Sequence, residues 1–348
     1  MTESILVTGG TGFVAGWCVV ELLRRGYEVR TTVRSPSRRD AVREAVARAV
    51  EPGGRLTFAV ADLTSDAGWD EAVAGCDRVL HVASPLGTET GRDQDALIGP
   101  ARDGTLRVLR AAVGAGVKRV VMTSACAAAS PPLATADSVS DESRWTDTDD
   151  PTLNGYRRSK AVAERAAWRF AEAGDAGAAA LTTILPGAVF GPVLGAANRG
   201  SVRVVERLLA GRMPGTPRIG FEVVDVRDLA DLHIRAMTAP EAAGERFVAT
   251  GEFLWMAQMA QVLRDELGDA ARKVPTRALP DLAVRLMARL DPGVRAVAPY
   301  LGRRHLHSAA KAERVLGWRT RAAVTTLADC ARSLAAHGLV PGRHGSTP

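Results

Sequence analysis

The chain has 348 residues, 46% of them hydrophobic and 24% charged, enough apolar material for two domains or for one domain with an extension. The formal net charge of +6 comes from 45 basic and 39 acidic residues. Because the arginines are scattered, no nucleic-acid-binding surface is indicated. Four cysteines without a C-x-x-C pair, and no signal-like N-terminus, predict reduced thiols and a cytoplasmic location. No apolar run reaches the ~18–20 residues of a membrane span, so we expect no membrane partner.

The first half of the chain alternates short apolar runs with helical patterns. Strands are predicted at residues 5–8, 27–33, 56–60, 78–82 and 119–123. Helices are predicted at residues 13–25, 40–49 and 105–113. Such an alternation predicts an α/β protein of the Rossmann type, a doubly wound parallel sheet with helices on both faces.

The second half is less regular. A helix is predicted at residues 157–173 and a strand at 181–185, after which Pro186 and Gly187 stop the pattern. Four further helices are predicted at residues 202–210, 227–237, 256–266 and 327–336. We assign residues 1–186 to a Rossmann domain. Residues 187–348 are expected to form mainly a smaller, mostly helical substrate-binding lobe, with segments that return to the first domain.

A glycine-rich loop follows the first predicted strand and opens the first helix. Its residues are Thr8-Gly9-Gly10-Thr11-Gly12-Phe13-Val14-Ala15-Gly16, with the spacing G-x-x-G-x-x-A/G. Glycines let the backbone turn tightly and approach a pyrophosphate, and the helix N-terminus adds N–H groups and a favourable dipole. A glycine run alone can be only a turn. Between a strand and a helix, this one predicts a dinucleotide site.

The end of the second predicted strand indicates which dinucleotide is bound. NAD-binding proteins usually place Asp or Glu there to hold the ribose 2′-hydroxyl. This chain instead has Thr31-Thr32-Val33-Arg34, and Arg34 can form a charge-assisted pair with a 2′-phosphate. Arg38 and Arg39 are close enough in sequence to assist. An ordinary solvated arginine is the alternative, but the lack of an acid favours NADPH/NADP+.

Tyr156 and Lys160 have the Y-x-x-x-K spacing at the start of a predicted helix. Residues four apart share one face of a helix, and a lysine ammonium beside a phenol favours the phenolate and lowers the tyrosine pKa. The phenol can then exchange a proton with a carbonyl oxygen near neutral pH. The bare pattern is common. Its position after the fifth strand and downstream of a nucleotide loop makes this pair the predicted catalytic centre.

These motifs resemble a known family. The chain is similar to the extended short-chain dehydrogenase/reductases, and within them to the branch of dihydroflavonol 4-reductase, cinnamoyl-CoA reductase and bacterial aldehyde and ketone reductases. The similarity runs over nearly the whole chain. Besides the glycine loop and the Tyr156–Lys160 segment, it is carried by residues 30–36, 61–63, 79–85, 141–145, 163–168, 185–186, 224–230 and 311–318.

The resemblance implies NADPH-dependent reduction of a ketone or aldehyde to an alcohol, with Tyr156 as the proton donor. Lys160 would assist Tyr156 and bind the nicotinamide ribose, and Arg34 would meet the 2′-phosphate. The other implied cofactor contacts are Gly9, Thr11, Gly12, Phe13, Val14, Asp62, Leu63, Val82, Ala83, Ser84, Pro186, Gly187 and Val189. The family also suggests a homodimer through two helices, one of which carries Tyr156.

The sequence departs from the family at the end of the fifth strand. The family places there a serine that helps to hold the substrate oxygen, but this chain has Thr123-Ser124-Ala125-Cys126, with Ala125 at the matching position. Ser124 should face the opposite side of a regular strand, so its catalytic participation needs a bulge or bend. A bound water is another substitute. A substrate with its own hydroxyl, or an imine, would need the donor less.

Two alternatives to carbonyl reduction stay open. One is other redox chemistry on this fold, such as hydroxysteroid-type oxidation, epimerisation, dehydration or imine reduction. The other is a non-catalytic NADP-binding or sensing protein, which Ala125 favours and the intact tyrosine–lysine pair opposes. His81 is expected to be a packed core residue. His305 and His307 have no carboxylate or cysteine cluster beside them in the sequence, so no metal is expected.

Overall fold

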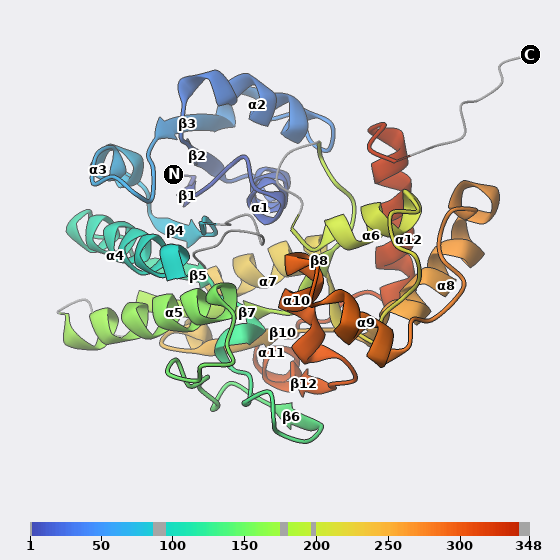
Figure 1. Cartoon of the computed structure of the whole chain (residues 1–348). Coiled ribbons are helices and arrows are strands. Elements are labelled where there is room, and N and C mark those ends of the chain that lie inside the picture. Colours follow the sequence, from blue (N-terminus) through green and yellow to red (C-terminus); the bar gives the residue numbers. More distant parts are fainter. Residues whose placement is uncertain (1, 86–94, 175–179, 196–199, 341–348) are drawn as a thin grey trace, which may run out of the picture.

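The computed structural model describes residues 2–85, 95–174, 180–195 and 200–340 (Figure 1). A seven-stranded sheet lies at its centre, with all strands parallel and in the order β10-β7-β5-β4-β1-β2-β3. The strands are β1 (Ser4–Val7), β2 (Glu28–Val33), β3 (Leu56–Val60), β4 (Arg78–His81), β5 (Arg119–Thr123), β7 (Leu181–Pro186) and β10 (Arg246–Ala249). The strand order reverses at β1, which places the ligand crevice at the carboxyl ends of β1 and β4.

Helices cover both faces of the sheet, as predicted for the Rossmann type (Figure 1). One apolar core joins the sheet to α1 (Phe13–Arg24), α2 (Arg39–Ala47), α7 (Val226–Thr238) and α11 (Ala310–Leu316). A second core on the opposite face joins it to α3 (Trp69–Val73), α4 (Ile98–Gly114) and α5 (Gly155–Ala173). Because the sheet is buried on both faces, its central strands consist mainly of apolar residues.

Strand β7 shows how a polar residue is tolerated in this setting. All six of its residues are buried, including two threonines. Thr182 Oγ1 donates to the carbonyl of Ala242 at 2.5 Å, and Thr183 Oγ1 donates to Glu164 Oε1 at 2.8 Å. Each buried hydroxyl therefore keeps a hydrogen-bond partner, and the strand can lie between two helical layers.

The remaining elements form a second group, which is mainly helical and also contains short strands. It contains α6 (Val202–Leu209), α8 (Met256–Leu267), α9 (Asp281–Met287), α10 (Pro292–Val297) and α12 (Ala323–Ala336). It also contains a three-stranded sheet of β8 (Ala188–Phe190), β9 (Gly220–Asp225) and β11 (Phe253–Trp255). Strand β6 (Ser138–Ser140) pairs with β12 (His305–His307). Most of these strands have only three residues, too few to show an alternating pattern.

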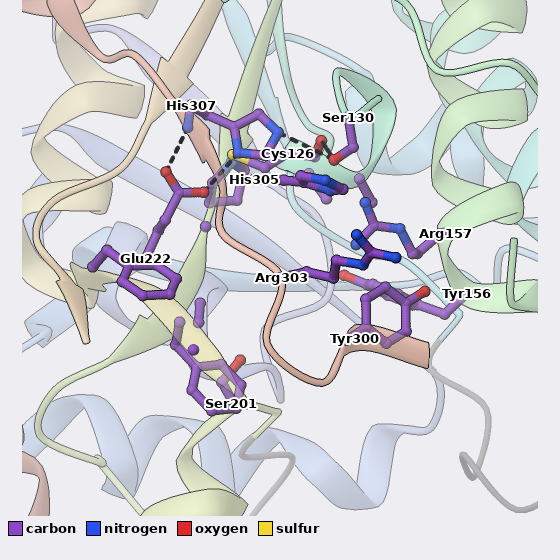
Figure 2. A pocket seen from close by; sticks show the side chains of 18 residues that line it. Cys126, Ser130, Tyr156, Arg157, Ser201, Glu222, Tyr300, Arg303, His305 and His307 are labelled. Carbon is purple, nitrogen blue, oxygen red and sulfur yellow. Dashed lines mark hydrogen bonds and ion pairs between the residues drawn. The ribbon is translucent and has the colours of Figure 1, made fainter. Parts of the chain in front are cut away.

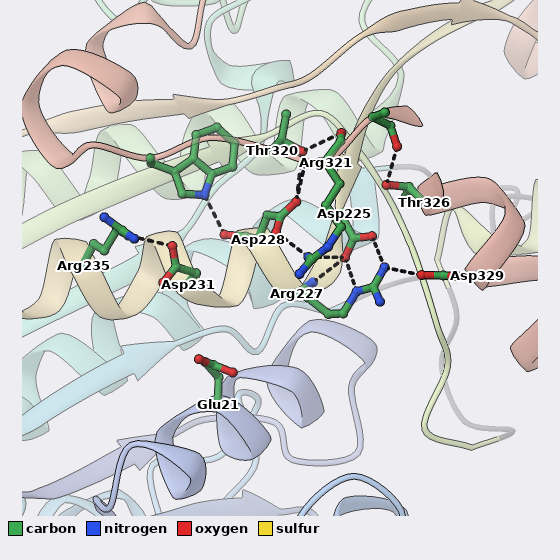
Figure 3. Close-up of polar contacts among 12 residues, drawn as sticks. Glu21, Asp225, Arg227, Asp228, Asp231, Arg235, Thr320, Arg321, Thr326 and Asp329 are labelled. Carbon is green, nitrogen blue, oxygen red and sulfur yellow. Dashed lines mark hydrogen bonds and ion pairs between the residues drawn. The ribbon is translucent and has the colours of Figure 1, made fainter. Parts of the chain in front are cut away.

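A polar network holds the β9–α7 junction to the C-terminal segments (Figure 3). Asp225 caps α7 by accepting the N–H of Arg227 at 2.8 Å, and its carboxylate pairs with the Arg227 guanidinium at 2.7 Å. Arg227 also pairs with Asp329 of α12 at 2.7 Å. The N–H of Arg321 donates to Asp228 at 2.7 Å. These ion pairs and hydrogen bonds join β9 of the second group to the start of α7, and they join α7 in turn to the C-terminal segments that contain Arg321 and Asp329.

No helix in the described part of the chain combines the length and apolar character that crossing a membrane requires.

Candidate active site

Two glycines set the turn after β1 close against neighbouring backbone. Gly9 has a φ of 77°, and a Cβ there would lie 3.0 Å from the Cβ of Ala83. A Cβ at Gly10 would lie 2.5 Å from Oγ1 of Thr31. The N–H of Gly9 donates to Thr32 Oγ1 at 2.8 Å. Larger residues at either position would push the turn away from the strand ends.

Helix α1 begins directly after this turn. Its N-cap residue, Gly12, makes no side-chain capping bond, and its own N–H donates to the Gly9 carbonyl at 2.8 Å. Thr11, Phe13 and Val14 are half-buried around the start of the helix. A helix N-terminus with a glycine surface offers backbone N–H groups and a positive dipole end to an anion. These residues therefore fit the pyrophosphate of a dinucleotide.

The ends of β2 and β3 bring Arg34 and Asp62 near one another. Arg34 is exposed directly after β2. The Asp62 carboxylate accepts the Thr64 N–H at 2.8 Å and the Thr64 hydroxyl at 2.7 Å. These bonds lower the pKa of Asp62, and the Arg34 charge adds a smaller lowering effect. Half-buried Leu63 follows, and its carbonyl accepts a hydrogen bond from Arg107 at 2.8 Å. An exposed guanidinium at this edge suits a 2′-phosphate.

The segment after β4 returns to the glycine turn. The N–H of Ala83 donates to the Thr8 hydroxyl at 2.9 Å, and this hydroxyl lies 3.0 Å from Nδ1 of His81. His81 is buried, and burial lowers its pKa to about 3, as expected of a neutral packed histidine. Val82, Ala83 and Ser84, which directly follow β4, are half-buried.

Helix α5 carries Tyr156 in its first turn and Lys160 one turn later. Tyr156 is 41% exposed, whereas Lys160 is only 6% exposed. The Lys160 ammonium donates to the Thr123 carbonyl at 3.4 Å, a long bond. Burial lowers the lysine pKa to about 8, and the charge of Glu164 opposes this shift. A partly desolvated lysine behind an accessible tyrosine is an arrangement that supports proton exchange at the phenol.

The end of β5 bears on the predicted catalytic role of Ser124. Ala125 is in extended backbone and lines the pocket, but Ser124 points away and donates to Glu164 Oε2 at 2.6 Å. Thr123 Oγ1 is 2.7 Å from Nε2 of His233. The strand therefore stays regular, without the bulge that Ser124 needed. The Ser124 hydroxyl bonds to the buried Glu164 carboxylate, which speaks against the catalytic role predicted for it.

Residues after β7 form the opposite wall. Pro186 and Gly187 line the pocket, and the Gly187 N–H donates to the Ala249 carbonyl at 3.0 Å. A Cβ at Gly187 would lie 2.5 Å from the carbonyl oxygen of Glu222, so β9 can approach closely only because this residue is glycine. Val189 is half-buried on β8.

A pocket of about 320 Å³ lies between these walls (Figure 2). Ala125, Tyr156, Pro186 and Gly187 come from the Rossmann side. Further polar side chains that line the pocket are Ser130, Arg157, Glu222, Arg303, His305 and His307. The volume is at the lower end of the range for small-molecule sites.

Three of these residues form a chain that the sequence did not predict. His307 Nδ1 lies 2.6 Å from Glu222 Oε2, and its Nε2 lies 3.1 Å from Ser130 Oγ. The His307 N–H also donates to Glu222 Oε1 at 2.6 Å. The three residues are far apart in the sequence and match no motif, so no local pattern could have indicated them.

The prediction of no metal rested on a reason that the structure corrects. Cys126, Glu222 and His307 offer possible ligand atoms within 4.8 Å of one another. These atoms are already engaged: both ring nitrogens of His307 have the contacts given above, and the Cys126 thiol donates to the Leu185 carbonyl at 3.2 Å. Burial also raises the thiol pKa well above its ordinary value. The absence of a metal stays a prediction.

The fold and this constellation define a dinucleotide-dependent α/β protein with a tyrosine–lysine pair at its pocket. The family described as the NAD dependent epimerase/dehydratase family matches residues 5–249, more than half of the chain. The chain belongs to this family.

Relatives and solved structures agree with the predicted branch. Cinnamoyl-CoA reductase 1 of Petunia hybrida is 37% identical over 265 residues, covering 75% of this chain and 76% of that protein. Anthocyanidin reductase ((2S)-flavan-3-ol-forming) of Vitis vinifera is 33% identical over 289 residues, covering 79% and 83%. The structure of Gre2 in complex with NADPH from Candida albicans aligns with a TM-score of 0.78 and 26% identity, covering 96% of this chain and 99% of that one. The resemblance stated from the motifs is confirmed.

Proposed function

We propose that this protein is an NADPH-dependent carbonyl reductase that converts a ketone or aldehyde to an alcohol, with Tyr156 as the proton donor. Its family and its reductase relatives identify it as an oxidoreductase. The observation that carries the finer proposal is the placement of Tyr156 in the lining of the pocket, one helical turn from buried Lys160. The expected homodimer and cytoplasmic location stay predictions.

The residues of the first domain fit NADPH. The glycine turn packs against Ala83 and Thr31 with no room for a Cβ, and the start of α1 suits a pyrophosphate. Arg34 would hold the 2′-phosphate, and Asp62 and Leu63 would border the adenine. Residues 82–84 would lie under the nicotinamide half, with residues 186–189 on its carboxamide side. When bound, NADPH supplies the hydride.

Tyr156 and Lys160 would manage the proton. The phenol, at the pocket surface, donates its proton to the substrate oxygen as the carbonyl becomes an alkoxide. Lys160 lies behind it with a pKa near 8, so its positive form is accessible at neutral pH and stabilises the phenolate that remains. Lys160 would also bind the nicotinamide ribose.

The substrate oxygen has one fewer fixed donor than in the family pattern. Ala125 contributes no hydroxyl, and Ser124 and Thr123 are bonded elsewhere. The pocket borders Ala125, so a water can take the position of the missing hydroxyl and bridge to the carbonyl. Tyr156 is then the main group that polarises the substrate carbonyl. The same observation favours a second candidate, a non-catalytic NADP-binding or sensing protein.

A reduction assay separates the two candidates. Purified protein would be given NADPH and a panel of activated ketones and aldehydes, with NADPH oxidation followed by absorbance. Turnover that falls by roughly 10²–10⁴-fold in Tyr156→Phe, with unchanged NADPH affinity, supports the proposal. NADPH binding without turnover of any compound would favour the sensing protein. Unchanged kcat in Tyr156→Phe would remove Tyr156 as the donor.

A further inference from the structure

Two arginines line the pocket without a carboxylate of their own. Arg157 directly follows Tyr156, and its guanidinium lies over the ring of Tyr300, 5.3 Å from the centroid. Arg303 joins the same wall, and its backbone N–H donates to the Tyr300 carbonyl at 3.2 Å. Among the described residues, neither guanidinium forms an ion pair. The Nε of Arg157 is buried with no hydrogen-bond partner there.

The carboxylate of Glu222, which also lines the pocket, already has hydrogen-bond partners. Glu222 accepts two contacts of 2.6 Å from His307, one on each carboxylate oxygen. Figure 2 shows Glu222 on one side of the pocket with His307, and Arg157, Arg303 and Tyr156 toward the other. Within the part of the chain that the structure describes, the Tyr156 side of the pocket therefore carries positive charge without an ion-pair partner for Arg157 or Arg303.

We propose that Arg157 and Arg303 form an anion subsite, and that the substrate is a small carbonyl compound bearing a carboxylate. This inference rests on the proposed reductase function. A guanidinium presents paired N–H donors that match a carboxylate, and such charge-assisted bonds are strong where water is partly excluded. Because Arg157 adjoins Tyr156, a carboxylate held there would fix the carbonyl near the phenol. The pocket of about 320 Å³ suits a short keto acid or aldehyde acid.

The subsite also bears on the missing hydroxyl at Ala125. A substrate whose carboxylate is bound by the two arginines is held at a second position besides its carbonyl. The carbonyl is then oriented toward Tyr156 with less need for a hydrogen-bond donor on β5. A neutral ketone lacks this anchor and would depend on Tyr156 and water alone. Substrate charge, more than size, should therefore decide which carbonyl compounds are reduced well.

The test compares acids with their neutral esters. kcat/KM would be measured for acetoacetate and 4-oxopentanoate and for the two methyl esters, in the wild type and in Arg157→Gln, Arg157→Lys and Arg303→Gln. We expect the wild type to prefer an acid by roughly 10- to 100-fold, the effect of one or two charge-assisted bonds. Arg157→Gln and Arg303→Gln should lose most of this preference and leave ester turnover nearly unchanged. Arg157→Lys should retain part of it.

Arg169→Gln is the matched control, since Arg169 is an exposed arginine on the same helix and does not line the pocket. Equal loss for acid and ester in Arg157→Gln, or a wild type that prefers esters, would overturn the subsite. A preference for dihydroxyacetone phosphate over both acids would overturn the carboxylate assignment.

A binding measurement separates this inference from the reductase proposal. The NADP+-loaded protein cannot reduce 4-oxopentanoate, so calorimetry reports its affinity alone. Binding that weakens in Arg157→Gln, but not in Arg169→Gln, supports the subsite even if no compound is turned over. Equal affinity for acid and ester would count against the subsite even in an active reductase.

Discussion

The two halves of the candidate site are encoded differently. The nucleotide half is built from contiguous segments after β1, β2 and β4, and backbone groups and glycines make most of it. The pocket half gathers single side chains from residues 125–130, 156–157, 220–222 and 300–307. A short motif is enough to define a nucleotide site made of backbone groups, but a pocket lined by side chains depends on how distant segments pack. The nucleotide half should therefore tolerate few changes, and the pocket half should accept many.

The largest expected effect is a gain. Ala125→Ser restores a hydroxyl at the pocket wall, where a preorganised donor typically contributes ~10²–10³ in kcat. We expect kcat for a neutral ketone to rise by at least tenfold, toward that range, measured by NADPH oxidation. Ala127→Ser, which places a hydroxyl elsewhere on the lining, is the control. If Ala125→Ser leaves kcat unchanged, the substrate oxygen is already oriented by other groups.

A second prediction concerns the buried lysine. Lys160 has a pKa of about 8 in the folded protein against 10.5 ordinarily, so between these values the unfolded chain binds more protons. The free energy of unfolding should therefore rise with pH across this window, by about 3 kcal/mol from this group, and be independent of it below pH 8. Denaturant unfolding of the cofactor-free protein at pH 7.5–10.5 measures it. Lys160→Met should lack this rise, and an identical slope in both proteins would contradict the assignment.

In the nucleotide half, Gly9→Ala should weaken NADPH binding by roughly 10- to 100-fold. The alanine must adopt a positive φ and its Cβ meets Ala83, so the turn shifts where the pyrophosphate would lie. Gly26→Ala is the matched control, because Gly26 has a φ of 89° and nothing within 4 Å of an added Cβ. It should lose stability but not NADPH affinity. If both variants lose the same NADPH affinity, backbone strain and not the shape of the Gly9 turn is the cause of the loss.

The smallest expected effect is at Arg34. Arg34→Gln removes a charge at the edge of the sheet and should lower NADPH affinity about tenfold while NADH affinity hardly changes. Fluorescence titration with both dinucleotides measures the ratio, and Arg169→Gln, at an exposed arginine on α5, controls for general charge loss. A wild type that binds NADH as tightly as NADPH would remove the basis for assigning Arg34 to the 2′-phosphate.

The sequence predicted much of the fold because short apolar runs mark the central strands and the helical period is visible in the segments between them. The parallel sheet, α1 and α5 could be anticipated in this way. Strand β10 was missed: it begins with Arg246, a buried residue that pairs with Glu164 at 2.9 Å, and so lacks an apolar run. Helix α4 begins at Ile98, whereas the sequence predicted a start at residue 105. The first turns were missed because Gly99 and Pro100 weaken the apolar pattern there.

The site could be predicted only in its local parts. Tyr156 and Lys160 are joined by helical spacing, and the glycine loop by its strand–helix context. The hydrogen bond from Ser124 to Glu164 could not be predicted, because the two residues lie 40 positions apart in the sequence. Glu222 of β9 and His307 of β12 likewise come together only in the folded chain, 85 positions apart in the sequence.

Glu164 has a consequence for how this protein can change over time. Its buried carboxylate binds Ser124 of β5, Thr183 of β7 and Arg246 of β10, so the helix that carries Tyr156 is fastened to three strands at once. Among the described contacts of Glu164, none reaches the pocket residues 220–222 or 300–307. Changes in those two segments can alter substrate preference while the proton donor keeps its place.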